Sequence, residues 1–296
     1  MNLDSLVISG GGYYGLAGVG FMYELFKYNS QIFDNIKVMS GCSIGSVIIV
    51  FLALGYKPID IILFVATKFK MPKMNEISID RLQKKHGLFN IEDIMSYLYM
   101  AMEDKFFDRN ITFLELSDFC GKELVINCFN LTDLTDVVFS TRLNPNMKIV
   151  DAVRYSIAIP LVFNKQLCDG KVYVDGGMHN NVPFEYICSP YTNKKRLYNV
   201  PNGYKDCICI EYDNSNNIEK TDSNESIVKY IMDIASKLYE MAKLKKVYID
   251  NIETISIKCE GNMLNTMSME TSEIMKMFDY GCKFFNDNYN KCNKSD

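Results

Sequence analysis

The sequence contains no tryptophan, only two histidines and no Cys-x-x-Cys motif among its 296 residues. The two histidines, His86 and His179, are too few for a metal site built mainly from imidazoles, so we expect no metal site. If the protein used a Ser-His-Asp triad, its catalytic base would have to be one of these two histidines. The formal net charge is −4, so there is no overall positive field to attract nucleic acid, and we expect no nucleic-acid partner.

Long apolar runs are also missing. The longest is Ser46–Leu54, far below the about 20 residues that a membrane-spanning helix needs. The N-terminal residues show neither a basic segment nor an apolar segment of the kind found in secretory signals. The ten cysteines are irregularly spaced, which favours reduced thiols over a disulfide framework. We therefore expect a cytoplasmic protein, with peripheral association at membranes.

What the sequence does contain is an alternation of strands and helices. A strand is predicted over Leu3–Ser9, a helix over Tyr14–Tyr28, a strand over Ile36–Met39 and then an apolar helix that ends at Gly55. This alternation is typical of a parallel α/β sheet. With 48% hydrophobic residues and no internal repeat, we expect one domain over residues 1–287 and a polar tail over residues 288–296.

The rest of the chain continues the mixed pattern. Helices are predicted over residues 59–69, 91–102, 147–156, 226–247 and 271–285, and strands over 123–129, 137–140, 207–211 and 253–258. Asp169-Gly170 predicts the turn of a hairpin between Leu161 and Val174. The helix over 226–247 has a wide apolar face, which favours a packing helix over a membrane-binding one; that face carries Ile227, Ile231, Ile234, Leu238 and Met241.

A glycine-rich loop follows the first strand, with the sequence Gly10-Gly11-Gly12-Tyr13-Tyr14-Gly15. Such a loop before a helix offers backbone N–H groups to a phosphate or to a developing oxyanion, although it also suits a simple tight turn. The spacing fits the dinucleotide-binding pattern, but the second strand ends without the acidic residue that this pattern requires. The Gly-Lys-Ser/Thr of a P-loop is absent too.

The second motif is Gly41-Cys42-Ser43-Ile44-Gly45, between a predicted strand and an apolar helix. A G-x-S-x-G motif in this setting is typical of a nucleophile elbow, where a sharp turn presents the serine hydroxyl. The helix that follows places its positive end beneath the attacking oxygen. The alternative is that Ser43 only caps the helix.

The third motif is Asp175-Gly176-Gly177, at the end of the predicted hairpin. A carboxylate that leaves a strand into glycines can be held rigidly beside a substrate, although Asp-Gly is also a common turn. The order of a Ser-Asp-His triad excludes His86, which precedes Asp175. His179 lies only four residues after Asp175, so a solvent-facing or supporting role is favoured for it. Asp175 is then the remaining candidate base.

Together these residues resemble the patatin-like phospholipase family. The glycine loop is similar to its oxyanion-hole loop, the Ser43 motif to its nucleophile elbow, and Asp175-Gly176-Gly177 to its catalytic-acid segment. The segment Ser156–Phe163 is similar to the Ser-x-Ala-x-Pro-x-x-Phe that precedes that acid in the family. All four motifs occur in the family's order.

The resemblance implies a three-layer α/β/α sandwich with a central, mostly parallel sheet. It implies a lipid acyl hydrolase that needs no metal or other cofactor and acts on a phospholipid or another lipid ester. Ser43 would be the nucleophile and Asp175 its base, with the elbow formed by Gly41 and Gly45. The acid loop would contain Gly176 and Gly177, and the oxyanion and substrate-binding groups would come from Gly10, Gly11, Gly12 and Gly15.

Two positions depart from the family's pattern. Tyr14 stands where members often carry Arg or Lys, which affects the electrostatics of the loop and its contacts with headgroups. Cys42 replaces a common Thr, and we expect it to be buried in the core.

Three functions share these motifs: a phospholipase A, a neutral-lipid lipase or transacylase with the same dyad, and a catalytically silent lipid-binding module. For transient association with a membrane surface, Phe64–Met74 interleaves lysines with apolar residues. This stretch suits either docking on anionic headgroups or a solvated loop.

Overall fold

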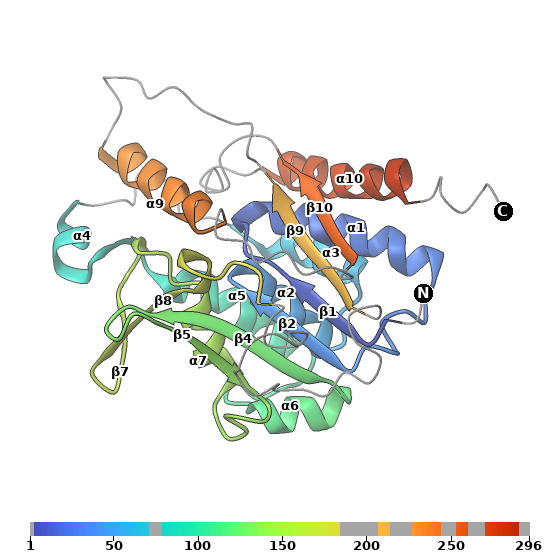
Figure 1. Cartoon of the computed structure of the whole chain (residues 1–296), viewed down its shortest axis with the longest axis horizontal. Helices are drawn as coiled ribbons and strands as arrows, with labels where there is room; N and C mark the ends of the chain where they lie inside the picture. Colours follow the sequence, from blue (N-terminus) through green and yellow to red (C-terminus); the bar gives the residue numbers. More distant parts are fainter. Residues whose placement is uncertain are drawn as a thin grey trace.

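The computed structural model describes residues 3–70, 79–183, 207–213, 227–243, 253–259 and 270–289. A central sheet is flanked by helices (Figure 1), as the sequence predicts. Five neighbouring strands are parallel, in the order β10 (Glu253–Lys258), β9 (Cys207–Asp213), β1 (Ser5–Ile8), β2 (Val38–Cys42) and β4 (Glu123–Asn130). Antiparallel strands continue beyond β4: β8 (Lys171–Asp175), β7 (Gln166–Cys168) and, off this path, β5 (Thr135–Ser140).

The strand register determines where the predicted motifs meet. Ile8 at the end of β1 pairs with Gly41 in β2 on one side and with Ile210 in β9 on the other. The loops that follow β1 and β2 therefore leave the sheet at the same edge, where ligands bind in open parallel sheets. Cys128 in β4 pairs with Asp175, the last residue of β8.

The helices follow the predicted order closely. They are η1 (Gly12–Tyr14), α1 (Gly15–Tyr28), α2 (Ile44–Ala53), α3 (Pro58–Lys68), α4 (Ile79–Lys85), α5 (Ile91–Asp104), α6 (Phe113–Cys120), α7 (Ile149–Ser156), η3 (Gly176–Met178), α9 (Ile227–Lys243) and α10 (Thr271–Asn288). The C-terminal helix α10 packs on α1, so close that a Cβ atom on Gly281 would lie 1.9 Å from the Ala17 carbonyl oxygen.

Among the described residues, no single helix has the length and apolar composition needed to cross a membrane. The pair α2 and α3 satisfies both criteria when taken together, with a bend of 117° between the two helices.

The predicted hairpin is confirmed for β7 and β8, where Asp169 (φ 49°) and Gly170 (φ 74°) form a turn with two left-handed residues. Its first part is wrong, because β6 (Leu161–Phe163) leaves the hairpin and pairs in parallel with β3 (Gly87–Phe89). The short elements α4, β3 and α6 were not predicted.

Helix α9 is only partly a packing helix, which corrects the prediction for this segment. Ile231 and Ala235 are buried, but Ile227, Leu238 and Met241 are exposed. The helix contacts η3 and β6. Its apolar face is therefore wider than the part of it that the protein covers.

All eight cysteines in the described part of the chain are free thiols, which agrees with the prediction of reduced cysteines. Cys188 and Cys292 lie outside the described residues.

Candidate active site

Ser43 occupies the sharp turn between β2 and α2. Its backbone has φ 52° and ψ −125°, a conformation that residues other than glycine rarely adopt and that is typical of a nucleophile elbow. The turn is tight: a Cβ atom on Gly45 would lie 2.2 Å from the Ile8 carbonyl oxygen, and one on Gly41 would lie 2.5 Å from the Gly45 carbonyl carbon. The two glycines therefore allow α2 to begin directly against the sheet.

The backbone of Ser43 is held by two other serine side chains. Its amide donates a hydrogen bond to Ser156 Oγ at 2.9 Å, and its carbonyl accepts one from Ser46 Oγ at 2.6 Å. Ser156 is the last residue of α7 and is fully buried. The motif that contains Ser156 was recognised in the sequence, but its contact with the elbow was not predicted.

Asp175 ends β8 and is fully buried beside the elbow. Its Oδ1 accepts a hydrogen bond from the Gly177 amide at 2.8 Å and lies 4.0 Å from Cys42 Sγ. The Asp175 amide donates to the Ala158 carbonyl at 2.9 Å, two residues after Ser156. The carboxylate therefore lies next to the residue that precedes Ser43.

Two buried thiols contact this region. Cys42 is buried, as expected, and its thiol points toward Asp175. Burial raises the pKa of the Cys128 thiol, and the nearby carboxylate of Asp175 raises it further. Cys128 therefore stays protonated at neutral pH.

The glycine loop lies beside the elbow. Gly10 exchanges two hydrogen bonds with Asn181: the Gly10 amide donates to the Asn181 carbonyl at 3.2 Å, and Asn181 Nδ2 donates to the Gly10 carbonyl at 3.0 Å. The Gly10 amide thus already donates a hydrogen bond within the protein. Of the three loop amides predicted as oxyanion donors, those of Gly11 and Gly12 remain the candidates. Gly15 packs against α2, since a Cβ atom there would lie 2.7 Å from the Ile44 side chain.

Tyr212 of β9 lies beneath this loop, and sequence reasoning missed it. A Cβ atom on Gly11 would lie 2.4 Å from its ring, so glycine is required where the loop crosses the tyrosine. Tyr14 is fully buried, with its ring centroid 6.4 Å from that of Tyr212. At the position where family members often carry Arg or Lys, this chain therefore has a core residue, Tyr14, which is not exposed to contact headgroups.

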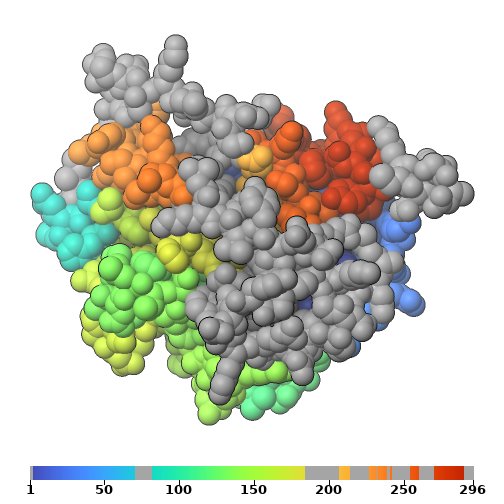
Figure 2. All heavy atoms as spheres, viewed as in Figure 1, coloured from blue at the N-terminus to red at the C-terminus, as the bar shows by residue number. Residues whose placement is uncertain are grey.

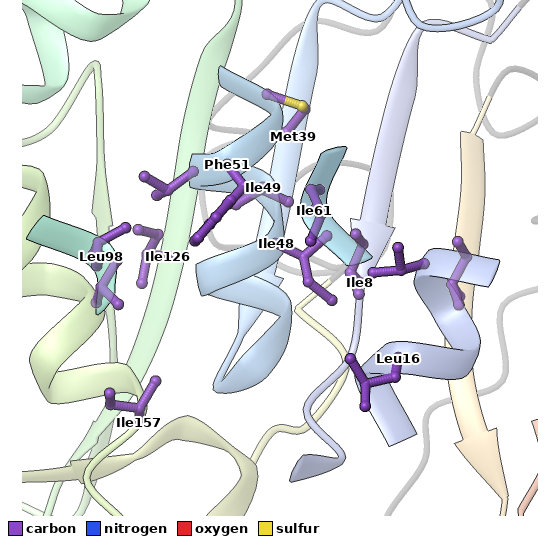
Figure 3. Close-up of a cluster of buried hydrophobic side chains, with 14 of the residues drawn as sticks. Ile8, Leu16, Met39, Ile48, Ile49, Phe51, Ile61, Leu98, Ile126 and Ile157 are labelled. Carbon is purple, nitrogen blue, oxygen red and sulfur yellow. The ribbon is translucent and has the colours of Figure 1, made fainter. Parts of the chain in front are cut away.

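An apolar cavity of about 200 Å³ is lined by Ser43, Gly12 and Gly15 at one part of its wall. The remaining wall is formed by side chains from α1, α2, α3, α5, α7, β3 and β6. Figure 3 shows several of these buried side chains together: Leu16, Ile48, Phe51, Ile61, Leu98 and Ile157. The cavity thus connects the candidate nucleophile to a hydrophobic interior.

The Phe64–Met74 stretch is only partly described. Phe64 and Phe69 line the cavity, and the Phe69 ring lies 4.7 Å from that of Tyr97. Phe64 and Phe69 therefore contribute to the cavity wall, while the docking interpretation, which also depends on Met71, Lys73 and Met74, stays a prediction. Residues 71–78 lie outside the described part of the chain.

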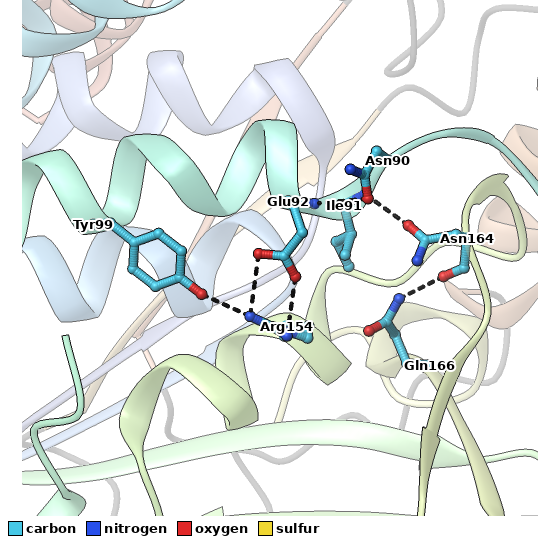
Figure 4. Close-up of polar contacts among 7 residues, drawn as sticks. All are labelled: Asn90, Ile91, Glu92, Tyr99, Arg154, Asn164 and Gln166. Atoms are coloured by element: carbon cyan, nitrogen blue, oxygen red, sulfur yellow. Dashed lines mark hydrogen bonds and ion pairs between the residues drawn. The ribbon is translucent and has the colours of Figure 1, made fainter. Parts of the chain in front are cut away.

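A polar network fixes α7, the helix that carries Ser156 (Figure 4). Arg154 forms an ion pair with Glu92 of α5 at 3.0 Å and donates to the Tyr99 hydroxyl at 2.6 Å. Nearby, Asn164 Oδ1 accepts a hydrogen bond from the Ile91 amide at 2.7 Å. The network ties α7 and the segment after β6 to the start of α5.

Both histidines lie away from the cavity wall. His179 Nδ1 is 2.9 Å from Asp136 Oδ1, and its ring stacks on Phe129 with the side chain 45% exposed. His86 is exposed, in a left-handed conformation after α4. Their predicted positions outside the catalytic centre agree with these contacts. The described residues also contain no group of three or more His, Cys, Asp or Glu side chains that could hold a metal ion.

Comparison with known proteins gives a consistent result. The profile of the patatin-like phospholipase family matches residues 6–187. A protein of Invertebrate iridescent virus 6 named probable lipid hydrolase 463L is 32% identical over 197 residues, which cover 64% of this chain and 65% of that protein. Uncharacterized protein R571 of Acanthamoeba polyphaga mimivirus is 35% identical over 183 residues, which cover 61% of this chain and 60% of that protein. The matches thus span less than two thirds of each relative.

Two solved structures share the fold. VipD from Legionella pneumophila superposes with a TM-score of 0.56 at 16% identity, covering 97% of this chain and 66% of that one. The type III effector protein ExoU superposes with a TM-score of 0.51 at 12% identity, and the superposition covers 98% of this chain and 53% of that one.

Proposed function

Because this chain belongs to the patatin-like phospholipase family, we propose that it is a lipid acyl hydrolase of the phospholipase A type with a Ser43–Asp175 dyad. The observation that carries the proposal is the position of Ser43. It occupies a strained elbow, beside a buried carboxylate and at the wall of an apolar cavity. A nucleophile, a base and a hydrophobic binding site are what the hydrolysis of a lipid ester requires.

In the acylation step, Ser43 Oγ attacks the ester carbonyl carbon while its proton passes to Asp175. The negative charge that develops on the carbonyl oxygen is stabilised by the amides of Gly11 and Gly12 and by the N-terminus of α2. The tetrahedral intermediate collapses when the bond to the alcohol breaks. Asp175 returns the proton to that alcohol, which leaves as a lysolipid, and the acyl group stays on Ser43.

In the deacylation step, a water molecule attacks the acyl-enzyme. Asp175 takes a proton from the water as its oxygen bonds to the carbonyl carbon. The fatty acid leaves when the bond to Ser43 Oγ breaks, and the proton returns to Ser43. A carboxylate is a weak base in water. Burial disfavours its charged form and so strengthens it as a base, and the fixed geometry of the site compensates further.

The apolar cavity is the proposed site for the acyl chain. Each methylene group moved from water into such an environment contributes about 0.8 kcal/mol. Binding of the chain would place the ester next to Ser43, because Ser43 belongs to the same wall. The protein is therefore proposed to work at a lipid surface, from which it takes its substrate.

The test is mass spectrometry of the products released from mixed phospholipid vesicles. The wild type should release fatty acid and lysophospholipid, and Ser43→Ala and Asp175→Asn should release neither above background. Unchanged release by Ser43→Ala would overturn the proposal. Acyl transfer to added glycerol or lysolipid in preference to water would favour a transacylase.

A serine-reactive phosphonate separates an enzyme from a silent binding module. Labelling of Ser43 in the wild type supports an activated nucleophile. An unlabelled Ser43 in a protein that still binds phospholipid vesicles would favour the binding module.

A further inference from the structure

Helix α9 presents a stripe of exposed apolar side chains. Ile227, Tyr230, Leu238 and Met241 are 56%, 52%, 43% and 62% exposed. With 3.6 residues per turn, these four positions lie on one side of the helix. The buried residues of α9, such as Ile231, lie next to this stripe and attach the helix to the protein. The stripe is thus the uncovered part of the α9 apolar face, beside the part that packs on the protein.

The stripe lies close to the proposed catalytic centre. Helix α9 contacts η3, which begins directly after Asp175, and it contacts β6. Strand β6 also forms part of the wall of the apolar cavity, because Val162 and Phe163 line that cavity. Leu161 on the same strand is 42% exposed. One strand therefore separates the apolar cavity from the neighbourhood of α9.

Basic side chains surround this region. Lys237 of α9, Lys85 at the end of α4 and Lys165 after β6 are exposed, and none of the three forms an ion pair within the described part of the chain. The Lys165 amide donates to the Lys85 carbonyl at 3.3 Å, so these two lysines lie on adjacent segments. Asp233 is the acidic residue of the described α9 side chains, and it is partly buried. Figure 2 shows the spheres of α9 and α4 on the same side of the molecule.

We propose that this surface docks the protein on anionic lipid membranes, with the apolar stripe and Leu161 in the interface and the three lysines on the headgroups. We name it the α9 surface: Ile227, Tyr230, Leu238, Met241 and Leu161 with Lys85, Lys165 and Lys237. An exposed apolar helix face with basic residues at its edge is the pattern of helices that lie in the membrane interface. Lysines near an anionic surface add electrostatic attraction.

The charges favour a membrane over a second copy of the chain. A two-fold contact in which the two α9 helices run antiparallel would place the lysine edge of one copy against that of the other, which is unfavourable. An anionic lipid surface instead complements both parts of the α9 surface at once. The inference rests on the proposed function, because docking here would bring lipid to the side of the protein where β6 forms the cavity wall.

The test is sedimentation of the full chain with vesicles of phosphatidylcholine, alone and mixed with phosphatidylglycerol. Leu238→Gln/Met241→Gln should lower the partition coefficient by roughly tenfold on mixed vesicles. The matched control Leu114→Gln/Leu143→Gln removes two leucines of similar exposure near α6, and should bind like the wild type.

The lysines are tested in the same assay. Lys85→Gln/Lys165→Gln/Lys237→Gln should lower binding to mixed vesicles by roughly tenfold or more and remove its salt dependence, with little change on phosphatidylcholine alone. Its control, Lys148→Gln/Lys276→Gln/Lys283→Gln, changes the net charge equally with exposed lysines elsewhere and should bind normally. Binding by either α9-surface variant that equals its control would overturn the proposal. So would a wild-type dimer in sedimentation velocity that Leu238→Gln/Met241→Gln dissociates.

A water-soluble p-nitrophenyl ester separates this proposal from the enzymatic one. The α9-surface variants should hydrolyse it at the wild-type rate and lose hydrolysis only on vesicles. If the wild type binds vesicles through the α9 surface but hydrolyses neither substrate, the proposed function fails and docking stands. If the wild type hydrolyses both substrates and the variants do so equally, docking fails and the proposed function stands.

Discussion

The Ser43 amide donates a 2.9 Å hydrogen bond to the buried hydroxyl of Ser156, 113 residues further along the chain. Ser156 ends α7, and two residues later the Ala158 carbonyl accepts the amide of Asp175. One short segment therefore contacts both the candidate nucleophile and the candidate base. We conclude that the segment from Ser156 to Ala158 aligns the two residues, although it has no chemical role of its own.

Removal of this acceptor should slow catalysis. Ser156→Ala leaves the buried Ser43 amide without its partner, which costs about 1–3 kcal/mol, and it weakens the strained elbow. We expect kcat on a soluble ester to fall roughly tenfold to hundredfold, with KM changed little, since the apolar cavity is intact. Steady-state kinetics measure both parameters.

Ser156→Thr keeps the hydroxyl and should recover part of kcat, a rescue that a merely structural role would not produce. Ser5→Ala is the matched control: Ser5 is a buried serine of β1 whose hydroxyl has no hydrogen-bond partner within the described residues. Its kcat should equal that of the wild type. Equal losses in Ser156→Ala and Ser5→Ala would rule out a positioning role.

The histidines should be dispensable. His179 interacts with Asp136 and His86 is exposed, so neither is placed to take the proton of Ser43. We expect His86→Ala/His179→Ala to keep kcat within about twofold of the wild type. The pH–rate profiles of the variant and the wild type should have the same shape, because no imidazole takes the proton of Ser43. A tenfold loss of kcat without a lower melting temperature would show that an imidazole takes part.

Gly45 should tolerate no side chain. A Cβ atom there would lie 2.2 Å from the Ile8 carbonyl oxygen, which is backbone and cannot move without shifting β1. Gly45→Ala should therefore lower the free energy of unfolding by about 1–3 kcal/mol and abolish activity through a displaced elbow. Denaturant unfolding and ester hydrolysis measure the two effects. An active variant of unchanged stability would contradict the tight packing of α2 on the sheet.

The sequence predicted the central elements because their signals are local. The glycines around Ser43, the Asp169-Gly170 turn and the apolar strands each specify backbone conformation through nearby residues. Helix α6 was missed although Thr112 and Glu115 form a capping box at its start, a recognisable signal. Strand β6 was assigned to the hairpin because its partner β3 is distant in the sequence and only three residues long.

The candidate site was predictable in its residue types but not in its contacts. The motifs indicated Ser43 and Asp175, while the engagement of the Gly10 amide by Asn181 depends on a contact across 171 residues. The exposure of the α9 stripe was hidden for a similar reason. Apolar periodicity shows which face of a helix is hydrophobic, but it does not show how much of that face the protein covers.

The apolar cavity, as the proposed binding site of the acyl chain, should set the preferred chain length. Val65 of α3 is a partly buried residue of the cavity wall, so Val65→Phe replaces empty space with a ring. Long-chain esters should lose more of their kcat/KM than short-chain esters, because each methylene that no longer fits forfeits about 0.8 kcal/mol, or roughly fourfold. Leu63→Phe is the control, since Leu63 lies on the same helix, is 52% exposed and is not part of the wall. A series of p-nitrophenyl esters of increasing length measures the preference. If both variants give the wild-type chain-length profile, the acyl chain binds elsewhere.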